Sequence, residues 1–444
     1  MEPDEVCSVD IVDVALPNDY GVAKREGLVI FVPGAIPGDR VRVRLRREKK
    51  GYAYGELVEI EGPSPHRVDP VCPHFGRCGG CSLRSLDYGQ QLLVKVNHLV
   101  QCLTRIGGIK DIQKWLEPIV PSVRTQHYRG MVELAFSFRE KRPRLGFRER
   151  VSPFSDYRHH VVAVQDCLIF STVLRSVVDR FSGVTRPGAG KGSGPLPVLK
   201  GLTVREAKST GQVMVVAEGD GPVPEVLLSM GRDLQPLLPG IASVYWVSAG
   251  RTTLVAGKAW IEERIGDLTF RIYPHAFFQP NPEGAALLYR KLKESLALTG
   301  QERILGLYCG AGPLELYLAS GAKEVVGIDS LEANIAGARE NCAINAIVNC
   351  TFRRMAVESM GSKGEGGVFD VVVVDPPRTG MTEGALKAAL KVEASRIAYV
   401  SCDPASLARD IKLLTAGGYA IERVIPFDFF PHTSHVEVLT ILRK

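Results

Sequence analysis

From about residue 283 to its end, the chain alternates short apolar segments with longer helical stretches, and this alternation restricts the fold more than any other feature. The apolar segments RILGLYC, VVGID, DVVVVD and IAYVS are of the type that is buried on both faces of a parallel sheet. Parallel strands need long crossover connections, which the helical stretches supply. The pattern therefore predicts an α/β fold with a doubly wound parallel sheet.

The last two apolar segments, GYAIERVIPFDFF and HVEVLTILRK, follow each other too closely for a helix to lie between them. Strands joined by such a short connection pair antiparallel. We therefore expect an antiparallel hairpin at the edge of the sheet.

The first 60 residues carry a different pattern, in which short alternating segments such as EGLVIFV and YAYGELVEI are separated by Gly/Pro turns. Five short strands with this spacing predict an OB-like β-barrel, a common nucleic-acid platform. Residues 40–50, RVRVRLRREKK, hold seven basic side chains against one Glu, with arginine at every second position of the strand. Such a cationic face suits a phosphate backbone, although a solvated strand face would explain the same run.

A Pro-rich linker, EGPSPHRVDPVCP, follows the barrel, and we expect three domains: the barrel at 1–61, a central α+β domain at 62–282 and the α/β domain at 283–444. No apolar run approaches the roughly 18 residues of a membrane helix. The acidic start, MEPDEVCSVD, lacks the pattern of a signal peptide. A cytoplasmic protein is the expectation.

A glycine-rich turn, in GLYCGAGPLELYLA, follows the first strand of the α/β domain, and Asp329 ends the second. Such a turn lets the backbone approach a nucleoside cofactor, and the carboxylate can accept hydrogen bonds from ribose hydroxyls. NAD enzymes share this arrangement, and ordinary tight turns would also produce it. The absence of a third glycine at dinucleotide spacing and the antiparallel closing strand favour S-adenosylmethionine (SAM).

Three reactive side chains are expected at one edge of this sheet. Active sites of open α/β sheets lie beyond the carboxyl ends of the strands, where Asp375 and Cys402 follow the fourth and fifth strands. The last strand runs the other way, so its beginning, at Glu437, reaches the same edge. The topology should therefore bring all three together.

This trio suits methylation of uracil at carbon-5. A Cys402 thiolate added to carbon-6 would make carbon-5 nucleophilic toward a methyl group, and Glu437 would then remove the carbon-5 proton. The helix that follows SCDP and nearby cationic groups are expected to favour the thiolate. Asp375, the PPR loop or both would bind the polar edge of the base.

Four motifs, DPPRTG, YVSCDPASLARD, FPHTSHVE and FFQPN, closely resemble those of the uracil-5 RNA methyltransferase family, and the barrel resembles the TRAM domain of its ribosomal-RNA members. The resemblance implies that Cys402 is the nucleophile and Glu437 the base. It places the SAM-binding residues at Gln279, Tyr308, Asp329 and Asp375.

Three positions depart from the motifs of that family. Gly306 replaces the Asp that usually begins the DLYCG segment, and Pro313 stands where a polar residue commonly follows the glycine loop. Asp403 replaces the more usual Asn beside the nucleophile. The first two changes are expected to alter SAM binding, and none removes a residue of the covalent step.

A cysteine cluster opens the central domain. CPHFGRCGGC supplies Cys72, Cys78 and Cys81, and VVAVQDCLIF supplies Cys167. On spacing alone, four thiolates suit either zinc or a [4Fe–4S] cluster, and a site without metal stays open. The resemblance to the same family implies the iron–sulfur cluster.

We therefore expect an enzyme that methylates carbon-5 of a uridine in RNA, with 23S rRNA as the first candidate substrate. The target uridine would have to leave its stack to reach Cys402. A tRNA methyltransferase and an RNA-binding protein with an inactive methyltransferase domain are the alternatives. A nicotinamide oxidoreductase is disfavoured, because the sequence lacks the glycine pattern of a dinucleotide-binding site.

Overall fold

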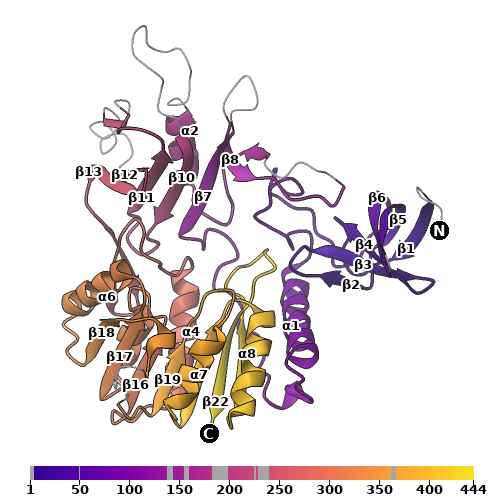
Figure 1. The fold of residues 1–444 in the computed structure, drawn as a ribbon. Helices are drawn as coiled ribbons and strands as arrows, with labels where there is room; N and C mark the ends of the chain where they lie inside the picture. Colours follow the sequence, from indigo (N-terminus) through magenta and orange to yellow (C-terminus); the bar gives the residue numbers. More distant parts are fainter. Residues whose placement is uncertain are drawn as a thin grey trace.

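The computed structural model describes residues 5–49, 51–137, 144–154, 160–182, 199–224, 227–228, 240–361 and 367–444. Three bodies are visible in Figure 1: an N-terminal sheet, a central sheet and a C-terminal α/β sheet covered by helices. None of the described helices is long and apolar enough to cross a membrane.

The N-terminal sheet has six strands in the order β1-β5-β6-β4-β3-β2, not the expected five. The segment around Ile11 and Val12 changes partners, because the Ile11 N–H bonds to Asp39 O and the Val12 N–H to Val22 O. The short segment between β1 and β2 is therefore bonded to two different parts of the sheet. The strands are β1 (Val6–Asp10), β2 (Asp13–Ala15), β3 (Tyr20–Arg25), β4 (Leu28–Pro33), β5 (Arg40–Lys49) and β6 (Tyr52–Gly62).

The alternation along β5 agrees with the sequence, because Val41, Val43 and Leu45 are buried in the core of this sheet. The arginines face outward, where three of them form ion pairs with glutamates of β6: Arg40 with Glu61, Arg42 with Glu59 and Arg46 with Glu56. Neighbouring carboxylates therefore partly neutralise the predicted cationic face.

The central sheet has seven strands in the order β13-β12-β11-β10-β7-β8-β9. Helix α2 (Val173–Ser182) packs on it. Leu174, Val177, Val178 and Phe181 share its buried face at helical spacing. The strands are β7 (Met131–Ser137), β8 (Arg144–Arg148), β9 (Val161–Ala163), β10 (Leu199–Glu206), β11 (Val213–Gly219), β12 (Ile241–Ser248) and β13 (Arg251–Gly257), with a separate hairpin of β14 (Ile261–Ile265) and β15 (Leu268–Ile272).

The C-terminal sheet confirms the doubly wound prediction, with strand order β18-β17-β16-β19-β20-β22-β21. Strands β16 to β20 are parallel, and β22 pairs antiparallel with both β20 and β21, so the last strand lies inside the sheet and β21 follows it. The strands are β16 (Arg303–Leu307), β17 (Glu324–Asp329), β18 (Cys350–Arg354), β19 (Val371–Val374), β20 (Arg396–Ser401), β21 (Ala420–Phe427) and β22 (Glu437–Arg443).

Helices cover both faces of this sheet. One face packs against α4, α5 and α6, and the other against α7, α8 and α1, so that Val371 and Val373 point into one core and Val372 and Val374 into the other. The helices are α1 (Tyr88–Arg105), α4 (Pro282–Leu296), α5 (Pro313–Ala319), α6 (Glu332–Ile344), α7 (Glu383–Lys391) and α8 (Pro404–Ala416), with short 3-10 turns η1 (Ile112–Lys114) and η2 (Val357–Ser359).

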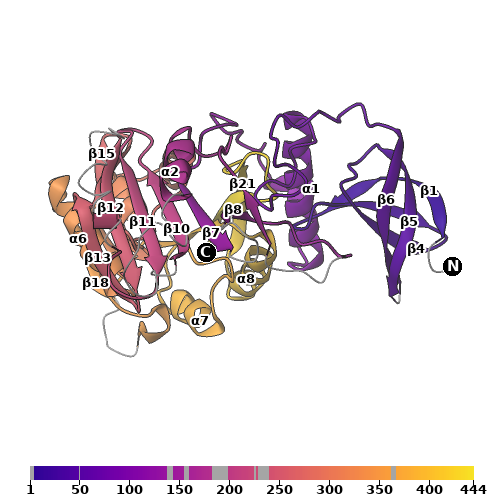
Figure 2. The ribbon, with the colours of Figure 1, turned by 90° about the horizontal axis from the view of Figure 1, so that it is seen from above.

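Residues 88–120 pack on the C-terminal sheet, although the sequence groups them with the central domain. Helix α1 stands beside α8, between the N-terminal sheet and the α/β body (Figures 1 and 2). The segment after it pairs with β21, through bridges between Leu116 and Val424 and between Val120 and Phe427. The outer edge of the sheet is therefore covered by a segment from much earlier in the chain.

Candidate active site

Cys402 lies between the end of β20 and the first turn of α8, as the sequence predicts. Asp403 caps the helix, because its carboxylate accepts a hydrogen bond from the Ser406 N–H at 2.7 Å. Asn and Asp are about equally good at this position, so the departure at 403 preserves the cap and adds a negative charge beside Cys402.

Glu437 is the first residue of β22 and pairs with Phe427 at the carboxyl edge of the sheet. Its side chain is buried, with 7% of the residue exposed. Burial raises the pKa of Glu437 well above its usual value, and the nearby Asp375 raises it further, while Arg378 lowers it. These interactions show that Glu437, Asp375 and Arg378 lie close together.

The thiol of Cys402 lies near the same three side chains. Burial, and then the negative charge of Glu437, raise its pKa to about 12; Asp375 and Asp403 add to this effect, and Arg378 opposes it. The predicted meeting of Asp375, Cys402 and Glu437 is therefore present. The expectation that the free protein favours the thiolate is wrong, because burial and three carboxylates outweigh Arg378 and the α8 N-terminus.

Asp375 connects this group of side chains to the loop before α4. The Gln279 amide donates to its carboxylate at 3.4 Å, and burial raises the pKa of Asp375 to about 7. The following Asn281 caps α4 and donates to Phe429 O at 2.7 Å, which ties the same loop to the segment before β22.

The glycine turn after β16 lies against the end of β17. Asp329 holds it, since one carboxylate oxygen accepts the Gly310 N–H at 3.0 Å and the other accepts the Leu331 N–H at 2.8 Å. Tyr308 has a φ of 61° and Gly312 a φ of 81°. A Cβ on Gly312 would lie 2.8 Å from the Phe352 ring, so only glycine fits there.

These elements match known proteins over nearly the whole chain. Residues 4–58 match the TRAM domain, and residues 249–444 match the family described as tRNA (Uracil-5-)-methyltransferase. A Bacillus cereus protein described as an uncharacterized RNA methyltransferase is 32% identical over 456 residues, which cover 98% of this chain and 96% of that protein. The chain belongs to the uracil-5 RNA methyltransferase family.

A further relative of this methyltransferase, an uncharacterized RNA methyltransferase of Halalkalibacterium halodurans, is also 32% identical and covers 98% of the chain. Among solved structures, the Pyrococcus abyssi tRNA (uracil-54, C5)-methyltransferase in complex with S-adenosyl-L-homocysteine has a TM-score of 0.74 and 29% identity, and the match covers 98% of this chain and 100% of that one. The protein is therefore a SAM-dependent RNA methyltransferase that acts on carbon-5 of uracil.

The two departures in the cofactor loop of this methyltransferase have structural reasons. Pro313 occupies the first turn of α5, where its missing N–H is not needed. Gly306 of β16 faces Glu315 of α5, and a Cβ at 306 would lie 2.2 Å from Glu315 Oε1. The sequence reading did not single out Glu315, which is 3% exposed and whose pKa burial raises to about 8.

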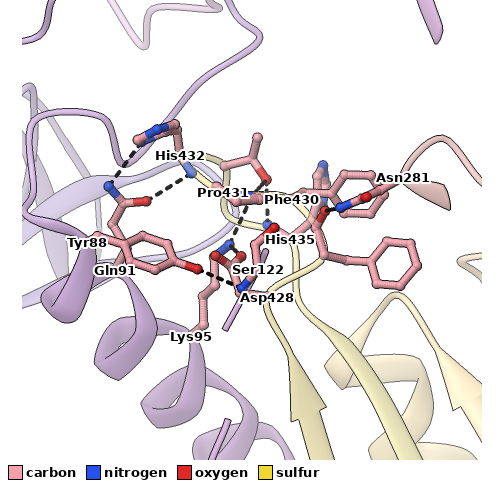
Figure 3. Close-up of polar contacts among 12 residues, drawn as sticks. Tyr88, Gln91, Lys95, Ser122, Asn281, Asp428, Phe430, Pro431, His432 and His435 are labelled. Atoms are coloured by element: carbon pink, nitrogen blue, oxygen red, sulfur yellow. Dashed lines mark hydrogen bonds and ion pairs between the residues drawn. The ribbon is translucent and has the colours of Figure 1, made fainter. Parts of the chain in front are cut away.

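The segment from Asp428 to Val436 carries the HTSH motif and is held by α1 of this methyltransferase (Figure 3). The fully buried Lys95 donates to Asp428 Oδ1 at 2.5 Å and to Phe430 O at 3.0 Å. Gln91 accepts the His432 N–H at 2.9 Å, and Tyr128 donates to Pro431 O at 2.9 Å. None of these residues was predicted from the sequence. The sequence does contain one signal: Gln91 and Lys95 stand on the buried face of α1 that also carries Leu99, Cys102 and Leu103.

Arg378, in the PPR loop, contacts the HTSH motif through its side chain. Its guanidinium lies 3.4 Å from His435 Nε2. Burial, and then the charge of Arg378, lower the pKa of His435 to about 4, so this imidazole is neutral at physiological pH. Arg378 itself is exposed and is the charged donor beside His435 and Glu437.

The four cysteines of the predicted metal site line one cavity of about 1200 Å³, which reaches the HTSH motif and the N-terminal sheet. Within the described ranges, no three His, Cys, Asp or Glu side chains are close enough together to bind one metal ion as they stand. The donor set nevertheless fits a thiolate-bound centre, and the Gly80 N–H points at Cys78 Sγ at 3.4 Å.

Basic side chains also line this cavity: Arg84, Arg129, Arg148, Arg150 and Lys200. Arg150 forms an ion pair with Asp19 of the N-terminal sheet, so the wall continues from one body to the next. Five carboxylates line the cavity as well, from Asp19, Glu133, Glu149, Asp166 and Glu218, so the basic side chains do not give it a net positive charge.

Proposed function

We propose that this enzyme methylates its target through a covalent bond between Cys402 Sγ and carbon-6 of the uracil. The observation that carries the proposal is the proximity of Cys402, Glu437 and Asp375 at the carboxyl edge of the sheet, where their charges act on one another. Bond formation at carbon-6 gives an enolate whose carbon-5 accepts the methyl group. SAM supplies that methyl group.

Glu437 then takes the carbon-5 proton, the carbon-5–carbon-6 double bond re-forms and the Cys402 sulfur leaves as the thiolate. Both Cys402 and Glu437 must be deprotonated for these steps, and both have raised pKa values in the free protein. Arg378 is the cation that lowers both values, and it is placed to bind a uracil oxygen or the enolate.

Gln279, Tyr308, Asp329 and Asp375 are proposed to bind SAM. Each oxygen of Asp329 accepts one backbone N–H, which leaves lone pairs for the two ribose hydroxyls. Tyr308 directly follows the carboxyl end of β16 and so lies at the same end of the sheet.

The proposed substrate is 23S rRNA, supported by the combination of a TRAM domain with four cavity-lining cysteines. The similarity to the Pyrococcus abyssi tRNA enzyme favours tRNA as the second candidate. Mapping 5-methyluridine in rRNA and tRNA from cells with and without this protein separates them, since the modification should disappear from one population only.

We also propose that Cys72, Cys78, Cys81 and Cys167 hold a [4Fe–4S] cluster. The support is that all four cysteines line one cavity and that the Gly80 N–H donates to Cys78 Sγ. The cluster loop reaches the catalytic segment, because the Ser82 and Leu83 N–H groups both donate to His432 O at 2.9 Å. A cluster there would stiffen the support of the HTSH motif.

The covalent mechanism is tested with RNA that contains 5-fluorouridine, in which fluorine replaces the carbon-5 proton and blocks the final elimination. Incubation with SAM should give a protein–RNA adduct that survives denaturation and maps to Cys402. Cys402→Ala should form none. An adduct of equal yield in that variant would refute the nucleophile.

A further inference from the structure

Gly306 and Glu315 form a matched pair in the cofactor domain. Gly306 lies one residue before the end of β16, between Gly327 of β17 and Val373 of β19. The space next to it is filled by the Glu315 side chain, since a Cβ on Gly306 would lie 2.2 Å from Oε1 and 2.8 Å from Cγ. One position can carry a side chain only if the other gives way.

The carboxyl group of Glu315 has an incomplete set of partners. It is 3% exposed, and Oε2 has no hydrogen-bond partner among the described residues. The charges of Asp375 and Asp329 act on it unfavourably, and no described Lys or Arg balances them in its surroundings. A buried polar oxygen without a hydrogen-bond donor costs stability. A bound ligand that donates a hydrogen bond to Glu315 would remove this cost.

The position of Glu315 indicates which part of the cofactor that donor belongs to. Strand β16 lies between β17, which ends in Asp329, and β19, which leads to Asp375. A SAM molecule with its ribose at Asp329 and its methyl group facing Cys402 and Asp375 crosses the end of β16. Its methionine moiety, which carries an α-ammonium group, then lies over the Gly306–Glu315 pair.

We propose that Glu315 binds the α-ammonium group of the cofactor's methionine moiety, with the carboxylate supplied from helix α5 instead of from position 306 of the strand. The inference deepens the proposed function, on whose SAM site it rests. It also explains why the Gly306 departure need not weaken the cofactor site: the negative charge is supplied from a different element.

Binding of three ligands to the full chain tests this assignment by calorimetry. SAM and S-adenosyl-L-homocysteine both carry the ammonium group, whereas 5′-methylthioadenosine lacks the amino-acid moiety. Glu315→Gln keeps the shape and removes the charge, so it should weaken the first two ligands by about tenfold and leave the third unchanged. Equal weakening of all three, or of none, would overturn the assignment.

A double variant tests whether the carboxylate acts through its location. Glu315→Ala should lose affinity for both ammonium-bearing ligands, and Gly306→Asp in that background should recover most of it, because the new carboxylate enters the vacated space. A double variant that folds, shown by wild-type binding of 5′-methylthioadenosine, and yet binds SAM no better than Glu315→Ala contradicts the proposal. Failure of wild-type protein to bind SAM would instead count against the proposed function itself.

Discussion

At the scale of single residues, the charges around Cys402 set its reactivity. Asp403 follows the nucleophile directly and raises its pKa, while Arg378 lowers it. Asp403 has a second role as the cap of α8, and asparagine can fill that role without the charge. The two roles of Asp403 can therefore be separated by one substitution.

Asp403→Asn should lower the pKa of Cys402 and speed its alkylation by iodoacetamide at pH 8 by roughly threefold. Arg378→Gln should slow it by a similar factor. The chain has ten cysteines, so the rate is read on the Cys402 peptide by mass spectrometry. The melting temperature of Asp403→Asn should stay near that of wild type; a slower alkylation without unfolding would show that the charge of Asp403 does not govern this thiol.

Glu437→Gln should trap the enzyme on ordinary uridine RNA. The thiol addition and methyl transfer need no carboxylate at 437, but the carbon-5 proton then has no acceptor. A SAM-dependent covalent adduct should accumulate on denaturing gels, at least tenfold above wild type, with turnover lowered by about 10²-fold or more. Full turnover without adduct would assign the base to another group.

Stability should fall as pH rises from 6.5 to 8.5. Burial raises the pKa of Asp375 to about 7 and of Glu315 to about 8, above the usual values of 3.8 and 4.5. The folded state therefore holds more protons than the unfolded state in this window, and each proton lost costs stability. His435, with its pKa lowered to about 4, acts in the opposite direction only below pH 6.5. The melting temperature should drop by a few degrees, and Glu315→Gln should flatten the slope.

At the scale of elements, the sequence predicted those contacts that depend on strand order. The carboxyl-edge meeting of Cys402 and Glu437 depends only on topology, and the helix after SCDP only on local capping. The pair of Lys95 and Asp428 was not predictable, because its partners are 333 residues apart. A lysine on the buried face of α1 indicates that an anion lies nearby, but it does not identify Asp428. The relation between Gly306 and Glu315 depends on side-chain packing, which a motif comparison does not contain.

Lys95→Met should destabilise the fold strongly, because it leaves Asp428 buried without its cation; such losses cost about 3–5 kcal/mol. Thermal melting and methyl transfer should both decline, since Asp428 and Phe430 begin the segment that carries the HTSH motif. Lys387→Met removes an exposed pair with Glu383 on α7 and should cost less than about 0.5 kcal/mol. Equal effects of the two variants would mean that the Lys95 pair does not anchor the loop.

At the scale of the whole molecule, residues from all three bodies line the cavity that reaches the HTSH motif. Arg150 joins the N-terminal sheet through Asp19, and its guanidinium also donates to Cys81 O. The next residues after Cys81 hold His432 O through two N–H donors. The segment that carries Cys72, Cys78 and Cys81 thus contacts both the cavity wall at Arg150 and the HTSH segment.

If the cysteines hold a [4Fe–4S] cluster, loss of the cluster should loosen the hydrogen bonds from Ser82 and Leu83 to His432 O. Anaerobically purified protein should be brown, with about four irons and four sulfides per chain. Cys81→Ser should lower the iron content and methyl transfer together, because the Ser82 and Leu83 donors lose their anchor. Cys342→Ser is the matched control: its thiol lies in α6 and donates to Ile347 O at 3.0 Å, so iron content should not change. Stoichiometric zinc in place of iron, or full iron binding in Cys81→Ser, would overturn the cluster assignment.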